Sequence, residues 1–166
     1  MSNAPSVMWA KGKSQSQANG AAEKYTDVRE RALRSRESSS KPDTHHDMKV
    51  LYEFWAHFLV RNFNRKMYDE FRDYAFEDDQ RNASVGLEQL SRYYDQVLSK
   101  PRVISDTLVA HYIELVKHEK ANAEPKSRTP AFTRLRAAWR NGALDMKSRK
   151  KIDSLVGPEL KEELER

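Results

Sequence analysis

Few residues of this 166-residue chain have types and spacings that support catalysis or metal binding. Cysteine is absent, which excludes disulfides, thiolate zinc sites, iron–sulfur clusters and thiol nucleophiles. Only five glycines occur, and no glycine-rich phosphate-binding motif is present. His45 and His46 lie near Asp43 but have no further ligand at helical spacing, which argues against a metal site. The acidic run at residues 77–79 is interpreted as charge at a helix end. We therefore expect no enzyme and no cofactor.

Basic side chains are the most prominent chemical group. The chain carries 30 Lys and Arg against 25 Asp and Glu, and nine of the basic residues fall within residues 124–151. A segment of this kind suits a polyanionic partner, with an affinity that falls as salt rises. The residues that could follow a phosphate backbone are Arg134, Arg136, Arg140, Lys147, Arg149, Lys150 and Lys151. The alternative is a solvated basic face without a partner.

The elements that must position these residues are helices. Apolar residues recur at helical spacing and no segment alternates with period two, so the sequence predicts an all-α fold. The clearest helix spans residues 47–62, with one apolar stripe that includes Trp55. Further helices are expected over 24–37 and 64–81, between Ser84 and Pro101, from Ser105, over 131–141, and in a tail divided at Gly157-Pro158. The aromatic cluster of Trp55, Tyr93 and Tyr94 has the spacing of a core. No apolar run suits a transmembrane helix or a signal peptide, so no membrane partner is expected.

An internal repeat with a period near 40 residues indicates how these helices are arranged. The pattern that begins at Tyr25 and ends at Leu33 recurs from Tyr68 to Phe76, and more loosely from Leu108 to Val116. Two helices per repeat at this period are typical of HEAT-like tandem helical hairpins, a short α-solenoid; an ordinary helical bundle is the alternative. The expected organisation is a disordered leader over 1–22, HEAT-like repeats over 23–123, a linker over 124–130, and a degenerate third repeat with a basic helical tail over 131–166.

One long stretch resembles a known family. The segments LYEFWAHFL (51–59), FNRKMYDEF (63–71), the pair Glu77-Asp78 and GLEQLSRYY (86–94) are similar to the C-terminal tandem-repeat region of La-related protein 1. The resemblance implies a cytoplasmic, HEAT-like, RNA-binding module that recognises the cap and pyrimidine-rich 5′ end of messenger RNA. It implies a role in translational control, with translation-related proteins as further partners.

The cap site of that family transfers only in part. Its Arg, Tyr and Glu, spaced four and seven residues apart, correspond to Arg92, Gln96 and Ser99. An Arg and a Phe of the preceding repeat correspond to Glu53 and His57. A second stacking Tyr has no counterpart within residues 134–144, where Trp139 is the aromatic residue that could replace it. A cationic, flat methylguanine is held between two aromatic faces, so these substitutions argue against tight cap binding by the family's mode.

Two hypotheses therefore stay open from the sequence. The first is an RNA-binding module that uses Arg92 and the basic third of the chain, including Arg136 and Arg140. The second is a protein-interaction scaffold that has lost cap binding. Arg92, Gln96 and Ser99 are spaced to share one helix face. Arg92 is expected to contact RNA, and the alternative is an ion pair with Glu88 or Asp95.

Overall fold

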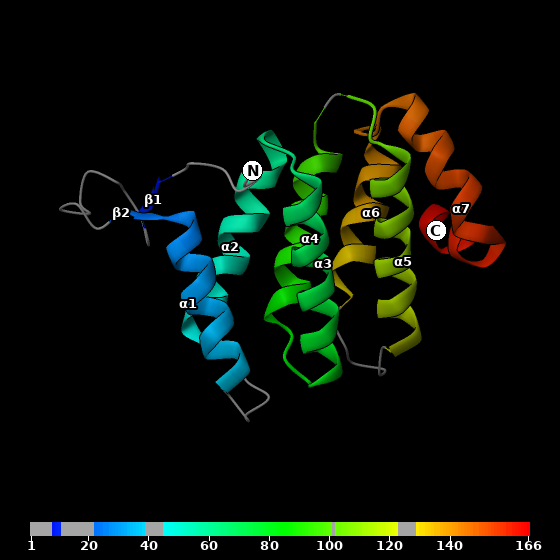
Figure 1. Cartoon of the computed structure of the whole chain (residues 1–166). Coiled ribbons are helices and arrows are strands. Elements are labelled where there is room, and N and C mark those ends of the chain that lie inside the picture. The colour runs from blue at the N-terminus through cyan, green and yellow to red at the C-terminus, as the bar shows by residue number, and fades with distance from the viewer. Residues whose placement is uncertain (1–7, 11–21, 39–44, 101, 123–128) are drawn as a thin grey trace. The chain divides into compact units, whose positions relative to one another are not determined.

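The computed structural model describes residues 8–10, 22–38, 45–100, 102–122 and 129–166, and its helices confirm the all-α prediction (Figure 1). The chain divides into two compact units, residues 1–90 and 91–166, with the division inside helix α4. The predicted limits at residues 22, 123 and 131 are set by sequence repeats and linkers, and they stay a prediction. Within the described ranges, no helix has the length and apolarity needed to cross a bilayer.

The first unit contains a short ribbon and the first helices. Strands β1 (Met8–Ala10) and β2 (Ala22–Lys24) pair antiparallel, with Met8 opposite Lys24. Strand β1 lies within the predicted leader over 1–22 and β2 begins at its last residue; the other leader residues lie outside those described. The helices are α1 (Tyr25–Ser38), α2 (His46–Arg61), α3 (Arg65–Gln80) and the first part of α4 (Val85–Leu98).

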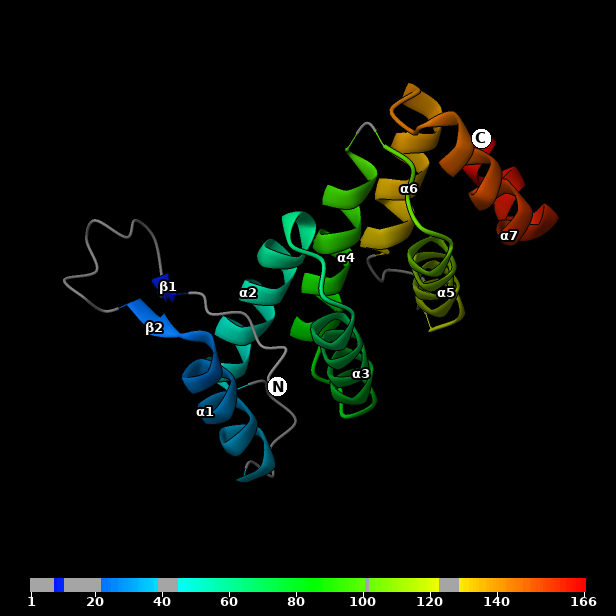
Figure 2. The ribbon, with the colours of Figure 1, turned by 45° about the horizontal axis from the view of Figure 1, so that its top comes forward.

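The second unit contains the rest of α4 and three further helices: α5 (Asp106–Asn122), α6 (Pro130–Asn141) and α7 (Met146–Glu165). Helices α5, α6 and α7 contact one another in pairs (Figure 2). Helix α7 is interrupted at Gly157, whose φ of 81° and ψ of 166° are not helical. The prediction of a tail divided at Gly157-Pro158 is therefore confirmed.

Short-range hydrogen bonds begin most of these helices. His45 accepts from the amide of Asp47 through Nδ1 at 3.1 Å, so this residue caps α2. Asn64 accepts from the amide of Met67 at 3.0 Å, and Ser105 from that of Leu108 at 3.3 Å. Each side chain satisfies an amide that has no partner inside the helix. The predicted starts at Asn64 and Ser105 are confirmed.

Aromatic side chains fill the core of the first unit. Trp55 and Tyr52 of α2 pack against Phe71 of α3, with ring centroids 5.6 and 6.0 Å from that of Phe71. The indole of Trp55 donates to the hydroxyl of Tyr25 at 2.9 Å. Burial raises the pKa of Tyr25 to about 12. Trp55 is fully buried, as its core spacing predicted.

A buried carboxylate joins three helices of this unit. Asp78 of α3 is only 5% exposed, and it accepts from the hydroxyl of Tyr52 at 2.6 Å and from Nε of Arg36 at 3.1 Å. Burial, followed by the hydrogen bond to Asp78, raises the pKa of Tyr52. Residues 77–79 lie in the last turn of α3, as predicted, but Asp78 is buried and hydrogen-bonded, which the helix-end interpretation did not include. Its donors come from residues 26 and 42 positions away, which no local pattern reveals.

An aromatic contact and several hydrogen bonds join the helices around the core of the second unit. Tyr112 of α5 packs on Tyr94 of α4, with ring centroids 5.1 Å apart, and donates to the carbonyl of Ala131 at 2.8 Å. Burial raises the pKa of Tyr112 well above its ordinary value. Glu119 of α5 accepts from the amides of Ala131 and Phe132 at 2.9 and 3.2 Å. Glu119 therefore caps α6, whereas Thr129, the residue before the helix, makes no side-chain cap bond.

Candidate nucleic-acid interface

Three predicted site residues lie on the outer face of α4. Arg92, Gln96 and Ser99 are all exposed, whereas Tyr93, Tyr94 and Leu98 of the same helix are buried. The apolar stripe of α4 faces the core, and residues four and seven positions after Arg92 return to its side of the helix. The hydroxyl of Ser99 donates to the carbonyl of Asp95 at 2.9 Å. The second unit therefore brings these three side chains onto one solvent-facing surface.

The guanidinium of Arg92 has no ion pair among the described residues. Its two expected partners are engaged elsewhere: Asp95 lies 3.7 Å from Arg134, and Glu88 accepts from the hydroxyl of Ser84 at 3.2 Å. An exposed guanidinium offers five donors to a phosphate or to a base edge. The alternative prediction of an ion pair with Glu88 or Asp95 is wrong.

Two further predicted positions lie on α2, in the first unit. Glu53 and His57 are both exposed and one helical turn apart. Their neighbours Phe54 and Trp55 are buried, so the helix turns Glu53 and His57 away from the core. The carboxylate of Glu53 gives this surface a negative charge, which repels phosphate.

Trp139 of α6 is part of the core of the second unit. It is 5% exposed, and the guanidinium carbon of Arg149 lies 3.7 Å above its ring (Figure 2 shows α6 beside α7). Arg149 also donates to the carbonyl of Trp139 at 2.7 Å. A base could stack on this indole only after Arg149 had moved away.

Most of the basic side chains predicted to follow a phosphate backbone are engaged within the second unit. Arg134 pairs with Asp95, and Arg149 covers Trp139. Lys151 lies 2.7 Å from Asp106 and donates to the carbonyl of Ile104 at 2.9 Å. Arg136 and Arg140 both donate to the main-chain oxygen of Arg166. These contacts reduce the number of cations that can reach a ligand without rearrangement.

The net positive charge of the chain lies in the second unit. Residues 91–166 carry 16 Lys and Arg against 11 Asp and Glu, whereas residues 1–90 carry 14 of each. The described residues contain no group of three or more His, Asp and Glu side chains placed to hold a metal ion. The excess of basic over acidic side chains in residues 91–166 suits an anionic partner.

A family model described as the LARP1 HEAT repeat region matches residues 13–124, which is about two thirds of the chain. The chain belongs to this LARP1 HEAT repeat family. Repeat families of this kind are helical scaffolds and not a class of enzymes. The match begins before β2 and ends just after α5, so α6 and α7 lie outside it.

Membership in the LARP1 HEAT repeat family agrees with the repeat seen in the sequence. The first repeat buries Tyr25, Val28 and Ala32 of α1, and the second buries Tyr68, Phe71 and Ala75 of α3 at the equivalent positions. The third, looser copy buries Leu108 and Leu115 of α5. Equivalent side chains therefore face the core in successive hairpins, as the HEAT-like prediction requires.

Two accessible basic residues, Lys100 and Arg102, were not predicted from the sequence as site residues. Arg102 is exposed and Lys100 is half-buried, and neither has an acidic partner among the described residues. Lys100 and Arg102 precede α5 and lie outside residues 124–151, where most of the predicted phosphate-binding residues occur. Their one sequence signal is that they flank Pro101, which ends a helix and marks a surface loop.

Proposed function

We propose that this chain is a non-catalytic RNA-binding module that engages the 5′ region of messenger RNA in the cytoplasm and contributes to translational control. The observation that carries the proposal is the guanidinium of Arg92, which is exposed on α4 without an ion pair among the described residues. The resemblance to the La-related protein 1 repeat region assigns this position to the ligand site. The net charge of +5 in residues 91–166 supports an anionic ligand.

The exposed residues of α4 do not form the usual site for a methylated cap. A methylated guanine needs two aromatic faces and a carboxylate on its base edge, and Gln96 and Ser99 provide neither. The α4 face instead offers one cation and two neutral polar groups, a set that suits phosphate and sugar oxygens. We therefore propose that the pyrimidine-rich RNA of terminal-oligopyrimidine messages is held mainly through its backbone.

The test is fluorescence anisotropy with two short pyrimidine-rich RNAs that differ only in the cap, at two salt concentrations. We expect both to bind with nearly equal affinities that fall as salt rises. The substitution Arg92→Gln should weaken binding of both RNAs. Arg61→Gln, which removes an exposed cation of the first unit, should leave it almost unchanged. Clear preference for the capped RNA would show that the cap is recognised by other residues.

A second candidate function is a protein-interaction scaffold. Glu53, Gln96 and Ser99 are exposed and replace the Arg, Tyr and Glu of the family's ligand site, which favours a surface that has changed its partner. Translation-related proteins are the partners that family membership suggests. Failure of both RNAs to bind at moderate salt would exclude the RNA-binding proposal in favour of this one.

A further inference from the structure

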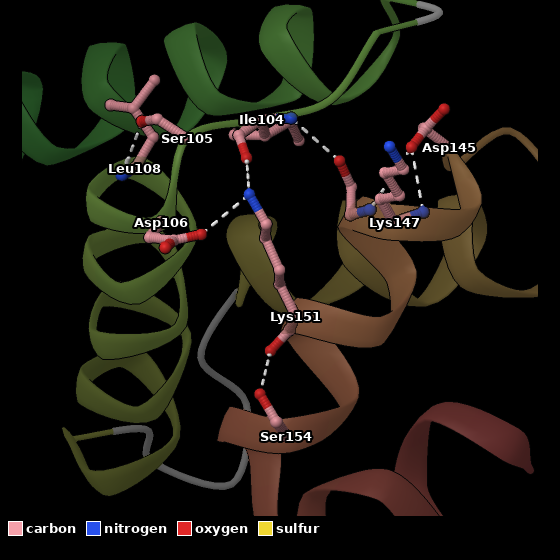
Figure 3. Close-up of polar contacts among 9 residues, drawn as sticks. Ile104, Ser105, Asp106, Leu108, Asp145, Lys147, Lys151 and Ser154 are labelled. Atoms are coloured by element: carbon pink, nitrogen blue, oxygen red, sulfur yellow. Dashed lines mark hydrogen bonds and ion pairs between the residues drawn. The ribbon is translucent and has the colours of Figure 1, made fainter.

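The α4–α5 loop is attached to the start of α7 by a small set of polar contacts (Figure 3). The amide of Ile104 donates to the hydroxyl of Ser148 at 2.9 Å, and Lys151 donates to the carbonyl of Ile104 at 2.9 Å. Lys151 also pairs with Asp106 at 2.7 Å, and Ser148 is fully buried. Both main-chain groups of Ile104 are therefore satisfied by α7, which fixes this part of the loop against the helix.

Two lysines of α7 flank this attachment point. Lys147 immediately precedes Ser148 and Lys150 immediately precedes Lys151, and both are exposed. Neither has an acidic partner among the described residues, in contrast to Lys151, whose charge is offset by Asp106. They are three residues apart, so they lie on one side of the first turns of α7.

The loop itself brings two more cations to the same end of the second unit. Arg102 is two residues before Ile104, and Lys100 is four residues before it. Figure 1 shows the end of α4, the start of α5 and the start of α7 at this one end of the unit. Lys100 directly follows Ser99, so the outer face of α4 leads into the loop without interruption.

We propose that Lys100, Arg102, Lys147 and Lys150 form a phosphate-binding surface, called here the loop–α7 surface, which contacts the RNA backbone beyond the Arg92 face. The proposal rests on the proposed function and specifies where a longer RNA is held. Lys151 and Ser148 position the loop and do not contact RNA. The basic residues of α6 are excluded from the surface because they are engaged within the protein.

Apolar side chains beside the cations add to the case. Met146 is 76% exposed and Val103 is 44% exposed, one next to Lys147 and the other next to Arg102. Exposed aliphatic side chains next to phosphate-binding cations can make van der Waals contacts with the bases while the backbone is held. An acidic peptide with apolar side chains would meet the same chemistry, so the experiment must separate the two.

The experiment measures binding of uncapped pyrimidine RNAs of 4 and 12 nucleotides to the full 166-residue chain over a salt series. The variant is Lys147→Gln/Lys150→Gln. The matched control is Lys49→Gln/Arg61→Gln, which removes two exposed, unpaired cations from the first unit. Both double variants change the net charge equally, so a difference between them reports position and not total charge. Arg102→Gln tests the loop separately.

We expect the α7 double variant to bind the longer RNA roughly 10-fold more weakly. Its plot of log affinity against log salt should be less steep by about 1.4, since each phosphate contact on a single strand contributes about 0.7. Arg102→Gln removes one contact, so it should make the plot less steep by about 0.7. The tetranucleotide should lose less affinity than the longer RNA in these variants, because fewer of its phosphates reach the loop–α7 surface while it contacts Arg92.

An unchanged slope for the longer RNA in the α7 double variant would overturn this inference while leaving the proposed function intact. Absence of binding by the unmodified chain to either RNA would instead overturn the proposed function. A labelled poly-glutamate peptide serves as the third ligand. Loss of its binding in the α7 double variant, with RNA binding unchanged, would assign the loop–α7 surface to an acidic protein and also overturn the inference.

Discussion

Asp78 is a charged side chain buried in the first unit. The stability lost when it is removed depends on the two groups that donate hydrogen bonds to it. Truncation to Ala would leave Arg36 without its carboxylate and the hydroxyl of Tyr52 without an acceptor. Breaking a buried, hydrogen-bonded charge pair costs about 3 kcal/mol or more. We expect Asp78→Ala to lower the free energy of unfolding, measured by urea denaturation, by about this amount.

The control for this prediction lies on the same helix. Asp69 pairs with Arg65 at 3.0 Å, but both side chains are largely exposed. Exposed pairs four residues apart contribute roughly 0.5 kcal/mol or less, and Asp69→Ala brings the same gain in helix propensity. An equal decrease in the free energy of unfolding in the two variants would show that the hydrogen bonds of Asp78 contribute no more than an exposed ion pair.

Tyr25 gives the first unit a dependence on alkaline pH. Its pKa is about 12 in the folded chain, against an ordinary value near 10. The folded state therefore holds this proton more tightly than the unfolded chain. The stability that Tyr25 contributes is complete below about pH 10 and is lost as the pH rises towards 12.

Urea denaturation between pH 8 and pH 12, with tyrosinate absorbance followed in parallel, checks this expectation. The variant Tyr25→Phe should be less stable at neutral pH, because the indole of Trp55 loses its acceptor. It should also lose less stability above pH 10 than the unmodified chain does. If the free energy of unfolding fell equally steeply above pH 10 in both proteins, the pH dependence would not come from Tyr25.

The positions of the candidate RNA-binding side chains could be predicted only in part from the sequence. The exposure of Arg92, Gln96 and Ser99 follows from the 3.6-residue period of α4, which the sequence contains. The engagement of Lys151 and Arg149 could not be predicted. Lys151 donates to a carbonyl 47 residues away, and Arg149 stacks on an indole of another helix. Such contacts depend on how helices pack, and composition alone counts every lysine and arginine as available.

At the scale of elements, the close approach of α3 and α4 depends on one glycine. A Cβ at Gly86 would lie 2.7 Å from the Cα of Ala75 on α3 and 2.9 Å from the ring of Tyr52 on α2. Replacing a helical glycine with alanine at an open site stabilises a helix by up to about 1 kcal/mol. Here the obstacle is main chain, which cannot rotate away, so Gly86→Ala should destabilise the chain by roughly 1–3 kcal/mol.

Thermal unfolding of Gly86→Ala beside Gln96→Ala tests this prediction, because Gln96 is an exposed position on the same helix. The control should unfold within a few degrees of the unmodified chain. A higher melting temperature for Gly86→Ala would mean that α3 and α4 do not approach each other closely at this point.

Helix limits could be predicted where the signal is local. The range 47–62 became His46–Arg61, and 64–81 became Arg65–Gln80. Asn64 and Ser105 act on amides three residues away, so the sequence reveals them. The cap of α6 differs, because Glu119 reaches it from α5 across 12 residues. Only the folded unit brings that carboxylate to the helix start.

At the scale of the whole molecule, the family match and the compact units end at different residues. The match ends at residue 124, whereas the second unit needs α6 and α7 to cover α5. Tyr112 donates to α6, Glu119 caps it, and Lys117 donates to the carbonyl of Leu155 on α7 at 2.9 Å. A chain that ends at residue 124 leaves the buried side of α5 exposed to water.

We expect such a truncated chain to keep the first unit and lose the fold of residues 91–124. Two-dimensional amide NMR should show dispersed signals from residues of α1, α2 and α3 and collapsed signals from α5. The unmodified chain, recorded in parallel, should show dispersed signals from all of these helices. Dispersed α5 signals in the truncated chain would show that the matched region folds independently.

The 40-residue repeat predicted the hairpins but not the division at Leu90 and Ser91. The repeat reports which side chains face a core, such as Ala32 and Ala75, and these positions are set within each helix. The limits of a compact unit depend on which helices share a core. That information lies in side-chain shapes distributed over distant segments, and a sequence period does not contain it.

The stacking of Arg149 on Trp139 makes the fluorescence of this indole a test of the proposed RNA contact. Arg149 lies between Lys147 and Lys150 in sequence, so a phosphate drawn to those lysines changes the electric field at the indole. The emission of Trp139 should shift as RNA is added, without any attached dye. The measurement uses a Trp9→Phe variant, which removes the third indole of the chain. Trp55, which is buried in the first unit and donates a hydrogen bond to Tyr25, then provides a constant background signal.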